Sequence, residues 1–438
     1  MKTPLPRKAA VPSAPLSDAM GHGAALSPGS RVLPWALGAA VAPYFVLRGW
    51  LNAAVVALGL AAVLGLMLDR RTRAWRAAPP VVWLACALCA PLVLTLLAQL
   101  LHGELVPRRF DGPARLALSA ALLLWLHLRR IDWLEVAGLA LPVAVLGCAA
   151  VVFAPAAAQF YWDGRLASYF MDPLMLSQHV AIVAFMCLFL LEVPEQHKPA
   201  WKLLKLLAFA TGVLVALRTG SRTGWVVMPV AALLWITRSP SRRQPRALAL
   251  GAAGVVVACV LAYLSSTIIQ ERVGDAVEDV RLYFSGASTD TSLGIRFSLF
   301  RIAWEAFSLK PLVGWGYAQL PPPQALPGVE HLWTPAVHSY YVSAGVHNEW
   351  LQNMVYGGLL GLASRLLLLG VPLVLFGRAA WHHEGHARLA GYLGLVLVAG
   401  YAAASMSSEV FNMVYLSAFY GLLVAACGAA AWSPSSSS

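Results

Sequence analysis

The chain has 438 residues, of which 59% are hydrophobic and only 12% are charged, and its mean hydropathy is +0.68. Soluble globular domains carry about 25% charged residues, so this composition excludes a soluble protein and indicates a chain that hides its apolar surface in lipid. The net charge of +12 comes from basic residues scattered over many loops, which does not favour nucleic-acid binding. We therefore expect an all-α, polytopic integral membrane protein.

The N-terminal residues 1–31 contain Lys2, Arg7 and Lys8 and are interrupted by several prolines. No apolar stretch with a small-residue cleavage site follows directly, so we interpret this segment as a cytoplasmic tail and not as a signal peptide.

Apolar stretches long enough to cross a membrane follow one another along the rest of the chain. We predict twelve transmembrane helices, at residues 32–48, 50–68, 80–101, 114–128, 133–153, 172–192, 203–217, 225–237, 247–268, 348–377, 389–406 and 411–431. The predicted organisation is a tail at 1–31, nine spans within 32–268, one large loop at 269–347, three spans within 348–432 and a short tail at 433–438.

Basic residues predict the orientation, because Lys and Arg are enriched in cytoplasmic loops. One side of the predicted bundle carries eighteen of them, almost all in short loops such as those around Arg70, Lys198 and Arg242. We expect that side to be cytoplasmic. Twelve spans then place both termini in the cytoplasm and the loop at 269–347 on the opposite side of the membrane.

The opposite side carries twelve basic residues, eleven of which are arginine. They are Arg48, Arg108, Arg109, Arg115, Arg165, Arg218, Arg222, Arg272, Arg281, Arg296, Arg301 and Lys310. The planar guanidinium offers a fork of donors that matches phosphate oxygens. A single arginine could instead cap a helix or pair with a local acid, but as a set these residues predict an anionic substrate.

The large loop begins with an acidic helical face formed by Glu271, Asp275, Glu278 and Asp279. A solvated face balanced by neighbouring arginines and a metal site are the two interpretations of this pattern, and we favour the first. The segment 296–310 follows, with aromatic residues and polar residues on opposite helical faces. Phe297, Phe300, Trp304 and Phe307 form one face, and Ser298, Arg301, Glu305 and Ser308 form the other. This pattern predicts an amphipathic helix at the membrane surface or over the mouth of the bundle.

Three local patterns indicate chemistry. The first is the polar turn at 219–224 between two spans, where Arg222 lies at the boundary of the membrane and is a candidate functional residue. The second joins Arg296 to the Pro-Leu-Val-Gly-Trp-Gly segment at 311–316. The third is His347-Asn348, followed by Gly358. A histidine at a helix start is disfavoured in its charged form by the helix dipole, so His347 is a candidate general base as well as a candidate structural residue.

Together these patterns resemble the O-antigen ligase/polymerase superfamily of bacterial envelope glycosyltransferases. The resemblance covers residues 205–365 by motif, and residues 111–115 (Asp-Gly-Pro-Ala-Arg) look like a segment shared by the lipopolysaccharide ligases. Some members have a second histidine two residues before the His-Asn pair, where this chain has Gly345, so His338 is the alternative catalytic histidine.

The resemblance implies a GT-C-like glycosyltransferase that moves preassembled O-antigen from undecaprenyl diphosphate to a sugar hydroxyl of lipid A–core, with inversion and without a metal or other cofactor. His347 would be the base, and Arg222 and Arg296 would bind the diphosphate, with Arg218, Arg115 and Arg301 as further candidates. An O-antigen polymerase and a protein O-oligosaccharyltransferase are alternatives in the same superfamily. An anionic solute transporter is the alternative from another class, but we find no internal repeat of the kind that transporters show.

Overall fold

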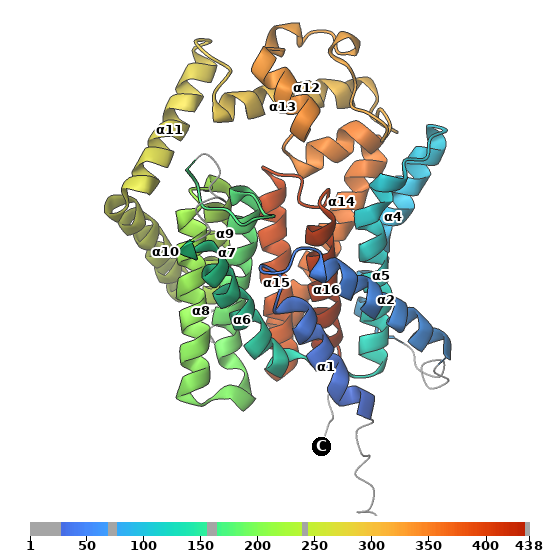
Figure 1. The fold of residues 1–438 in the computed structure, drawn as a ribbon, viewed down its shortest axis with the longest axis vertical. Coiled ribbons are helices and arrows are strands. Elements are labelled where there is room, and N and C mark those ends of the chain that lie inside the picture. The colour runs from blue at the N-terminus through green and yellow to red at the C-terminus, as the bar shows by residue number, and fades with distance from the viewer. Residues whose placement is uncertain (1–27, 69–76, 156–163, 239–243, 434–438) are drawn as a thin grey trace, which may run out of the picture.

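The computed structural model describes residues 28–68, 77–155, 164–238 and 244–433. Most of the predicted tails (residues 1–27 and 434–438), the arginines at 70–76 and those at 242–243 lie outside these ranges. The described chain is all-helical, in agreement with the predicted all-α membrane fold (Figure 1).

Helices occupy all twelve predicted span positions in the described chain. They are α1 (Pro28–Val41), α2 (Trp50–Leu68), α4 (Pro79–Leu101), α5 (Asp111–Leu128), α6 (Leu134–Val152), α7 (Pro173–Phe189), α8 (Pro199–Arg218), α9 (Arg222–Thr237), α10 (Pro245–Ser265), α14 (Glu349–His382), α15 (Gly385–Ser405) and α16 (Val414–Ala431). Nine of these helices, within the described ranges, are long and apolar enough to cross a membrane; α1 and α9 are shorter apolar helices, and α5 belongs to neither group. The prediction of one span at 32–48 is wrong in extent, because α1 ends at Val41 in turns around Pro43.

The centre of the bundle is formed by α7, α15 and α16, most of whose residues are buried. Polar side chains join these three helices inside the apolar core. The His179 imidazole of α7 lies 2.9 Å from the Tyr401 hydroxyl of α15, and this hydroxyl donates to the Leu416 carbonyl of α16 at 2.8 Å. These bonds satisfy polar groups that water cannot reach and fix the helices relative to one another.

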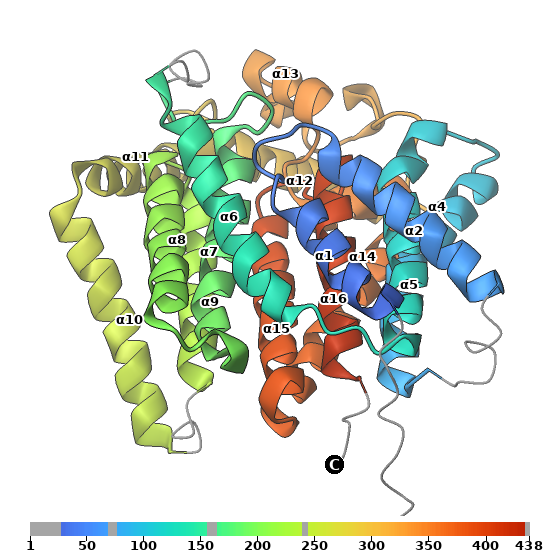
Figure 2. The same cartoon turned by 60° about the horizontal axis from the view of Figure 1, so that its bottom comes forward.

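One helix, α10, lies at the edge of the bundle and contacts only α9 and α11 closely (Figure 2). None of its residues is buried in the described chain, although it is among the most apolar helices. Such a helix fits a position that faces lipid.

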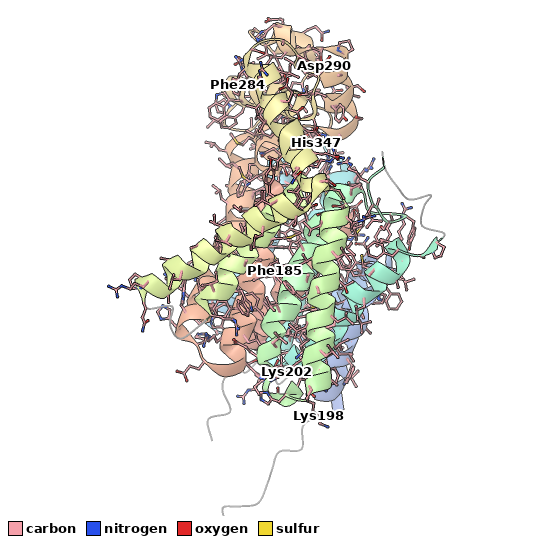
Figure 3. All side chains as sticks on the ribbon, turned by 90° about the vertical axis from the view of Figure 1, so that its left-hand side faces the viewer. Phe185, Lys198, Lys202, Phe284, Asp290 and His347 are labelled. Atoms are coloured by element: carbon pink, nitrogen blue, oxygen red, sulfur yellow. The ribbon has the colours of Figure 1, made fainter. Side chains whose placement is uncertain are left out.

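The segment between α10 and α14 contains α11 (Thr267–Phe284), α12 (Ser292–Leu309) and α13 (Pro335–Ala344) and lies across one end of the bundle (Figure 1). The side view in Figure 3 places His347 at this end and Lys198 and Lys202 at the opposite end.

The faces of α12 differ from the predicted faces. The helix buries an aliphatic side that includes Ile295, Leu299 and Ile302, in a separate apolar core shared with residues of α13 and α14. Ser298, which we expected on the polar face, is therefore fully buried, and Trp304 is exposed. The spacing of the aromatic residues correctly predicted a helix. The neighbouring segments, however, pack against the aliphatic residues of α12.

The 34-residue helix α14 is broken near its start by Gly358, whose φ of 57° and ψ of −137° are accessible to glycine alone. The 311–316 segment packs backbone to backbone against this break. The Trp315 N–H donates to the Val355 carbonyl at 2.8 Å, and the Leu359 N–H donates to the Pro311 carbonyl at 2.8 Å. A Cβ on Gly314 or on Gly358 would meet the main chain of the other segment, which explains why glycine stands at both positions.

Candidate functional site

The site is built around the first turn of α9. Gly220 turns the chain with a φ of 63°, Ser221 is the N-cap of α9, and Arg222 is its first residue. The positive end of the helix dipole and the guanidinium therefore act in the same place, which makes this terminus suited to an anion.

The Arg222 side chain is held from one side and open on the other. Its Nη2 atom lies 3.6 Å from Oδ2 of Asp279 in α11. Its Nη1 atom is buried and has no hydrogen-bond partner within the described residues. Buried donors are nearly always satisfied in folded proteins, so this atom indicates a ligand or a water that completes the site.

Arg296, in the first turns of α12, faces the same region. Its pKa is lowered by burial and by the positive charges of Arg222 and Arg165. No ion-pair partner of Arg296 occurs in the described ranges. Arg296 is thus repelled by the positive charges of Arg222 and Arg165, and a bound anion would stabilise this positive centre.

His347 lies beside this centre in the turn that leads into α14, with a left-handed φ of 57°. Burial and, after it, the charge of Arg296 lower the pKa of His347 to about 4. We expected a lowered pKa from the helix dipole, but the N-cap of α14 is Asn348, and burial and Arg296 are the causes. The buried Nε2 atom has no hydrogen-bond partner in the described chain, and the Tyr340 ring lies 5.8 Å away.

The structure thus brings together Arg222, Arg296 and His347, which come from three distant patterns of the sequence. Within the described residues, none of the other predicted residues makes a hydrogen bond or an ion pair with this group. Arg115 of α5 bonds to the Asp111 carboxylate at 3.3 Å and to its carbonyl at 3.0 Å. Arg218, at the end of α8, and Arg301, on α12, are exposed. His338 is exposed on α13, with its ring 6.1 Å from that of Trp333.

Two residues of the site were not singled out from the sequence. Arg165 precedes α7 and was named only as one of the twelve basic residues predicted on the non-cytoplasmic side. Asp279 was named only as part of the acidic face of the large loop. Side chains of Arg165 and Arg272 flank Gly220, so a Cβ there would lie 3.6 Å and 3.5 Å from them. Only tertiary folding brings these residues to the turn before α9.

The acidic face at 271–279 is balanced by arginines. Asp275 lies 3.5 Å from Arg272, and Glu278 lies 3.8 Å from Arg281. Within the described ranges, no group of three or more His, Cys, Asp and Glu residues is arranged to hold a metal ion. The pairing favours the interpretation of this face as a solvated, charge-balanced surface.

These residues provide two chemical capacities in one place: a positive centre with an unsatisfied donor, and an imidazole that is neutral at neutral pH. The first suits a phosphate or diphosphate, and the second suits proton abstraction from a hydroxyl.

Comparison with known proteins gives one family match. Residues 207–366 match the family model described as O-antigen ligase, a range that includes Arg222, Asp279, Arg296 and His347. An uncharacterized protein of Haemophilus influenzae is 21% identical over 247 residues. This alignment covers 53% of the chain and 58% of the relative, so the chain spans little more than half of that protein. The chain is a polytopic membrane protein, all-helical over its described residues, and its residues 207–366 are similar to the O-antigen ligase family.

Proposed function

We propose that the protein is a glycosyltransferase that transfers preassembled O-antigen from undecaprenyl diphosphate to a sugar hydroxyl of lipid A–core. The observation that carries this proposal is the unsatisfied Arg222 donor beside Arg296 and a neutral His347. Outside the inner membrane no nucleotide supplies energy, so the donor must carry its own leaving group, and a lipid diphosphate does so.

In the proposed reaction, Arg222 and Arg296 bind the diphosphate and stabilise the charge that develops on its oxygen as the bond to the sugar breaks. Two fixed guanidinium groups do this without a divalent cation. Asp279 positions Arg222 through the 3.6 Å contact and leaves its Nη1 atom for the substrate.

His347 is proposed as the general base. The acceptor hydroxyl oxygen attacks the anomeric carbon of the donor sugar, and its proton passes to His347 Nε2. The bond between the anomeric carbon and the diphosphate oxygen breaks, and undecaprenyl diphosphate leaves with the electron pair. A single displacement of this kind inverts the anomeric configuration.

We further propose that the protein lies in the bacterial inner membrane with both termini in the cytoplasm, and that residues 269–347 and the site face the periplasm. The position of Lys198 and Lys202 at the end opposite to His347 supports this orientation, because short basic loops are typical of the cytoplasmic side (Figure 3).

The test is reconstitution of the purified protein in vesicles with lipid-linked glycan and lipid A–core. Wild-type protein should form the linked product, His347→Ala should abolish transfer while donor binding is retained, and His338→Ala should keep most activity. Loss of transfer in His338→Ala with a normal His347→Ala rate would assign the base to His338. Product formed only on a second lipid-linked chain would make the protein a polymerase.

A further inference from the structure

The turn that carries His347 is held from its other side by two side chains. The Val346 N–H donates to Oε1 of Gln352 at 2.7 Å. Gly345 has a φ of 72°, and a Cβ there would meet Oε1 of Glu409 and Oε1 of Gln352 at 2.5 and 2.6 Å. His347 thus faces Arg296, and two residues earlier the same turn packs against Gln352 and Glu409.

Gln352 and Glu409 also line a cavity of about 50 Å³ between η1 (Pro107–Phe110), α14 and the connection from α15 to α16. The other polar residues around it include Arg108, Arg109, Asn353 and Asn412. This volume admits a few water molecules or one hydroxymethyl group, but not a whole sugar ring.

At this cavity, Nε2 of Gln352 and Oε1 of Glu409 make no hydrogen bond of good geometry in the described chain, although the backbone N–H groups of His347 and Val346 face the Glu409 carboxyl. Gln352 is only 2% exposed, and its Oε1 is already used by the Val346 N–H, so its amide nitrogen is an orphaned buried donor. An unmet donor and an unmet oxygen beside it match a hydroxyl group, which accepts one hydrogen bond and donates another.

The charge of the cavity also favours a neutral hydroxyl. Burial and the charge of Glu349 raise the pKa of Glu409 to about 8, so this carboxyl is mostly uncharged at neutral pH. The buried carboxylate of Glu349 is paired with Arg365 at 2.5 Å. A small cation would therefore find little uncompensated negative charge here.

The wall of the cavity is fixed before any ligand enters. The Arg109 guanidinium donates to the Tyr356 hydroxyl at 2.7 Å and to the Tyr317 carbonyl at 3.2 Å, and it lies over the Tyr356 ring. At the mouth, Arg108 and Asn412 are exposed and lie where the rest of a bound sugar would extend.

We propose that this cavity is the subsite for the acceptor glycan. One hydroxyl of the acceptor sugar bonds between Gln352 and Glu409, and the ring at the mouth presents a second hydroxyl to His347. This inference rests on the proposed transfer reaction, and it assigns the acceptor to the flank of the His347 turn opposite to the arginines. The glycan could come from lipid A–core or from a second lipid-linked chain, which share this chemistry.

The first test uses two variants in reconstituted vesicles. Gln352→Glu keeps the oxygen that holds Val346 and replaces the orphaned donor with an acceptor. Arg108→Ala removes an exposed side chain at the mouth. Both should raise the acceptor KM at least tenfold and leave the donor KM within twofold of wild type. Arg281→Gln, on the exposed face of α11, is the charge-removing control and should match wild type. The thermal midpoint of each variant checks that it is folded.

Unchanged acceptor KM in both folded variants, or a rise confined to the donor KM, would overturn the assignment. A second arm measures equilibrium binding of purified lipid A–core, and separately of a lipid-linked glycan, to His347→Ala protein, in which no turnover occurs. Adding Gln352→Glu to His347→Ala should weaken binding of the true acceptor at least tenfold. Equal binding by the single and double variants would refute the proposed acceptor subsite. If wild-type protein transfers to neither acceptor, the proposed reaction is refuted. The binding measurement then still shows whether the cavity binds a glycan.

Discussion

Asp279 joins Arg222 to the helix that carries Arg296. Its Oδ2 atom lies 3.6 Å from Nη2 of Arg222 and accepts the N–H of Leu293, in the first turn of α12, at 3.2 Å. One carboxylate therefore links the two arginines that we propose to bind the diphosphate, although they lie 74 positions apart in the chain.

The first prediction concerns the geometry of Arg222. Arg222→Gln should lower kcat by about 10²–10³-fold, the typical cost of losing one preorganised donor to a developing negative charge. Arg222→Lys should remain clearly impaired, because the ammonium keeps the charge but loses the planar fork. Transfer rates in vesicles measure both, with Arg281→Lys as the exposed control. A wild-type rate in Arg222→Lys would refute bidentate binding.

The second prediction concerns pH. Since burial and Arg296 lower the pKa of His347 to about 4, the base should stay neutral well below the ordinary histidine range. A plot of log kcat/KM against pH, which reports the free enzyme, should be flat from pH 7 to about 5 and should fall on the acid side only at lower pH. A histidine with an ordinary pKa of about 6.5 would lose activity about fivefold between pH 6.5 and 5.5, and tenfold for each further pH unit.

The same profile in Arg296→Gln supplies a check on the cause. Removing the nearby positive charge raises the pKa of His347, so the fall in activity should begin at a higher pH than in wild type. A wild-type profile that already bends between pH 6 and 7 would contradict the burial of the base.

The third prediction concerns the break in α14. Gly358→Ala forces a side chain into a conformation that only glycine adopts and places its Cβ against the main chain of the 311–316 segment. Strained conformations alone cost about 1–3 kcal/mol, and the backbone clash adds to this. The thermal midpoint in detergent should fall sharply, or the protein should not be recovered. Gly370→Ala, in the same helix, meets nothing within 4 Å and should be neutral or slightly stabilising.

The fourth prediction is metal independence. A diphosphate held by arginines needs no divalent ion to offset its charge, so EDTA should leave the transfer rate in vesicles unchanged. Activity that is lost in EDTA and restored by magnesium or manganese would refute this prediction. Asp275 and Asp279 would then be the first residues to test as ligands.

The helical fold was predictable from the sequence because long apolar stretches in a membrane leave few alternatives to a helix. Features that depend on packing partners were not. The buried face of α12 could not be predicted, since Phe297 and Ile295 are both apolar and only the neighbouring α13 and α14 decide which of them is covered. The end of α1 at Val41 reflects a proline two residues later within an otherwise apolar stretch.

Some residues of the candidate site could likewise be predicted from the sequence, and others could not. Arg222, Arg296 and His347 stand in local patterns of turn residues, glycines and helix starts, so the sequence predicted them. Gln352 and Glu409 carry no such pattern. Gln352 is one polar residue on an apolar helix, and Glu409 lies in a short connection; their role follows from the turn at Gly345, which they meet only after folding.

The interlocked backbones at Gly314 and Gly358 have a mechanical consequence. They couple the chain that follows α12 to the first turns of α14, and α12 and α14 also share an apolar core. Arg296 and His347 therefore lie on segments that these contacts hold together, whereas Arg222 belongs to the bundle helix α9 and is joined to α12 through Asp279. A diphosphate bound by both arginines would form a second bridge between α9 and α12, and its departure after transfer would leave Asp279 as the remaining link.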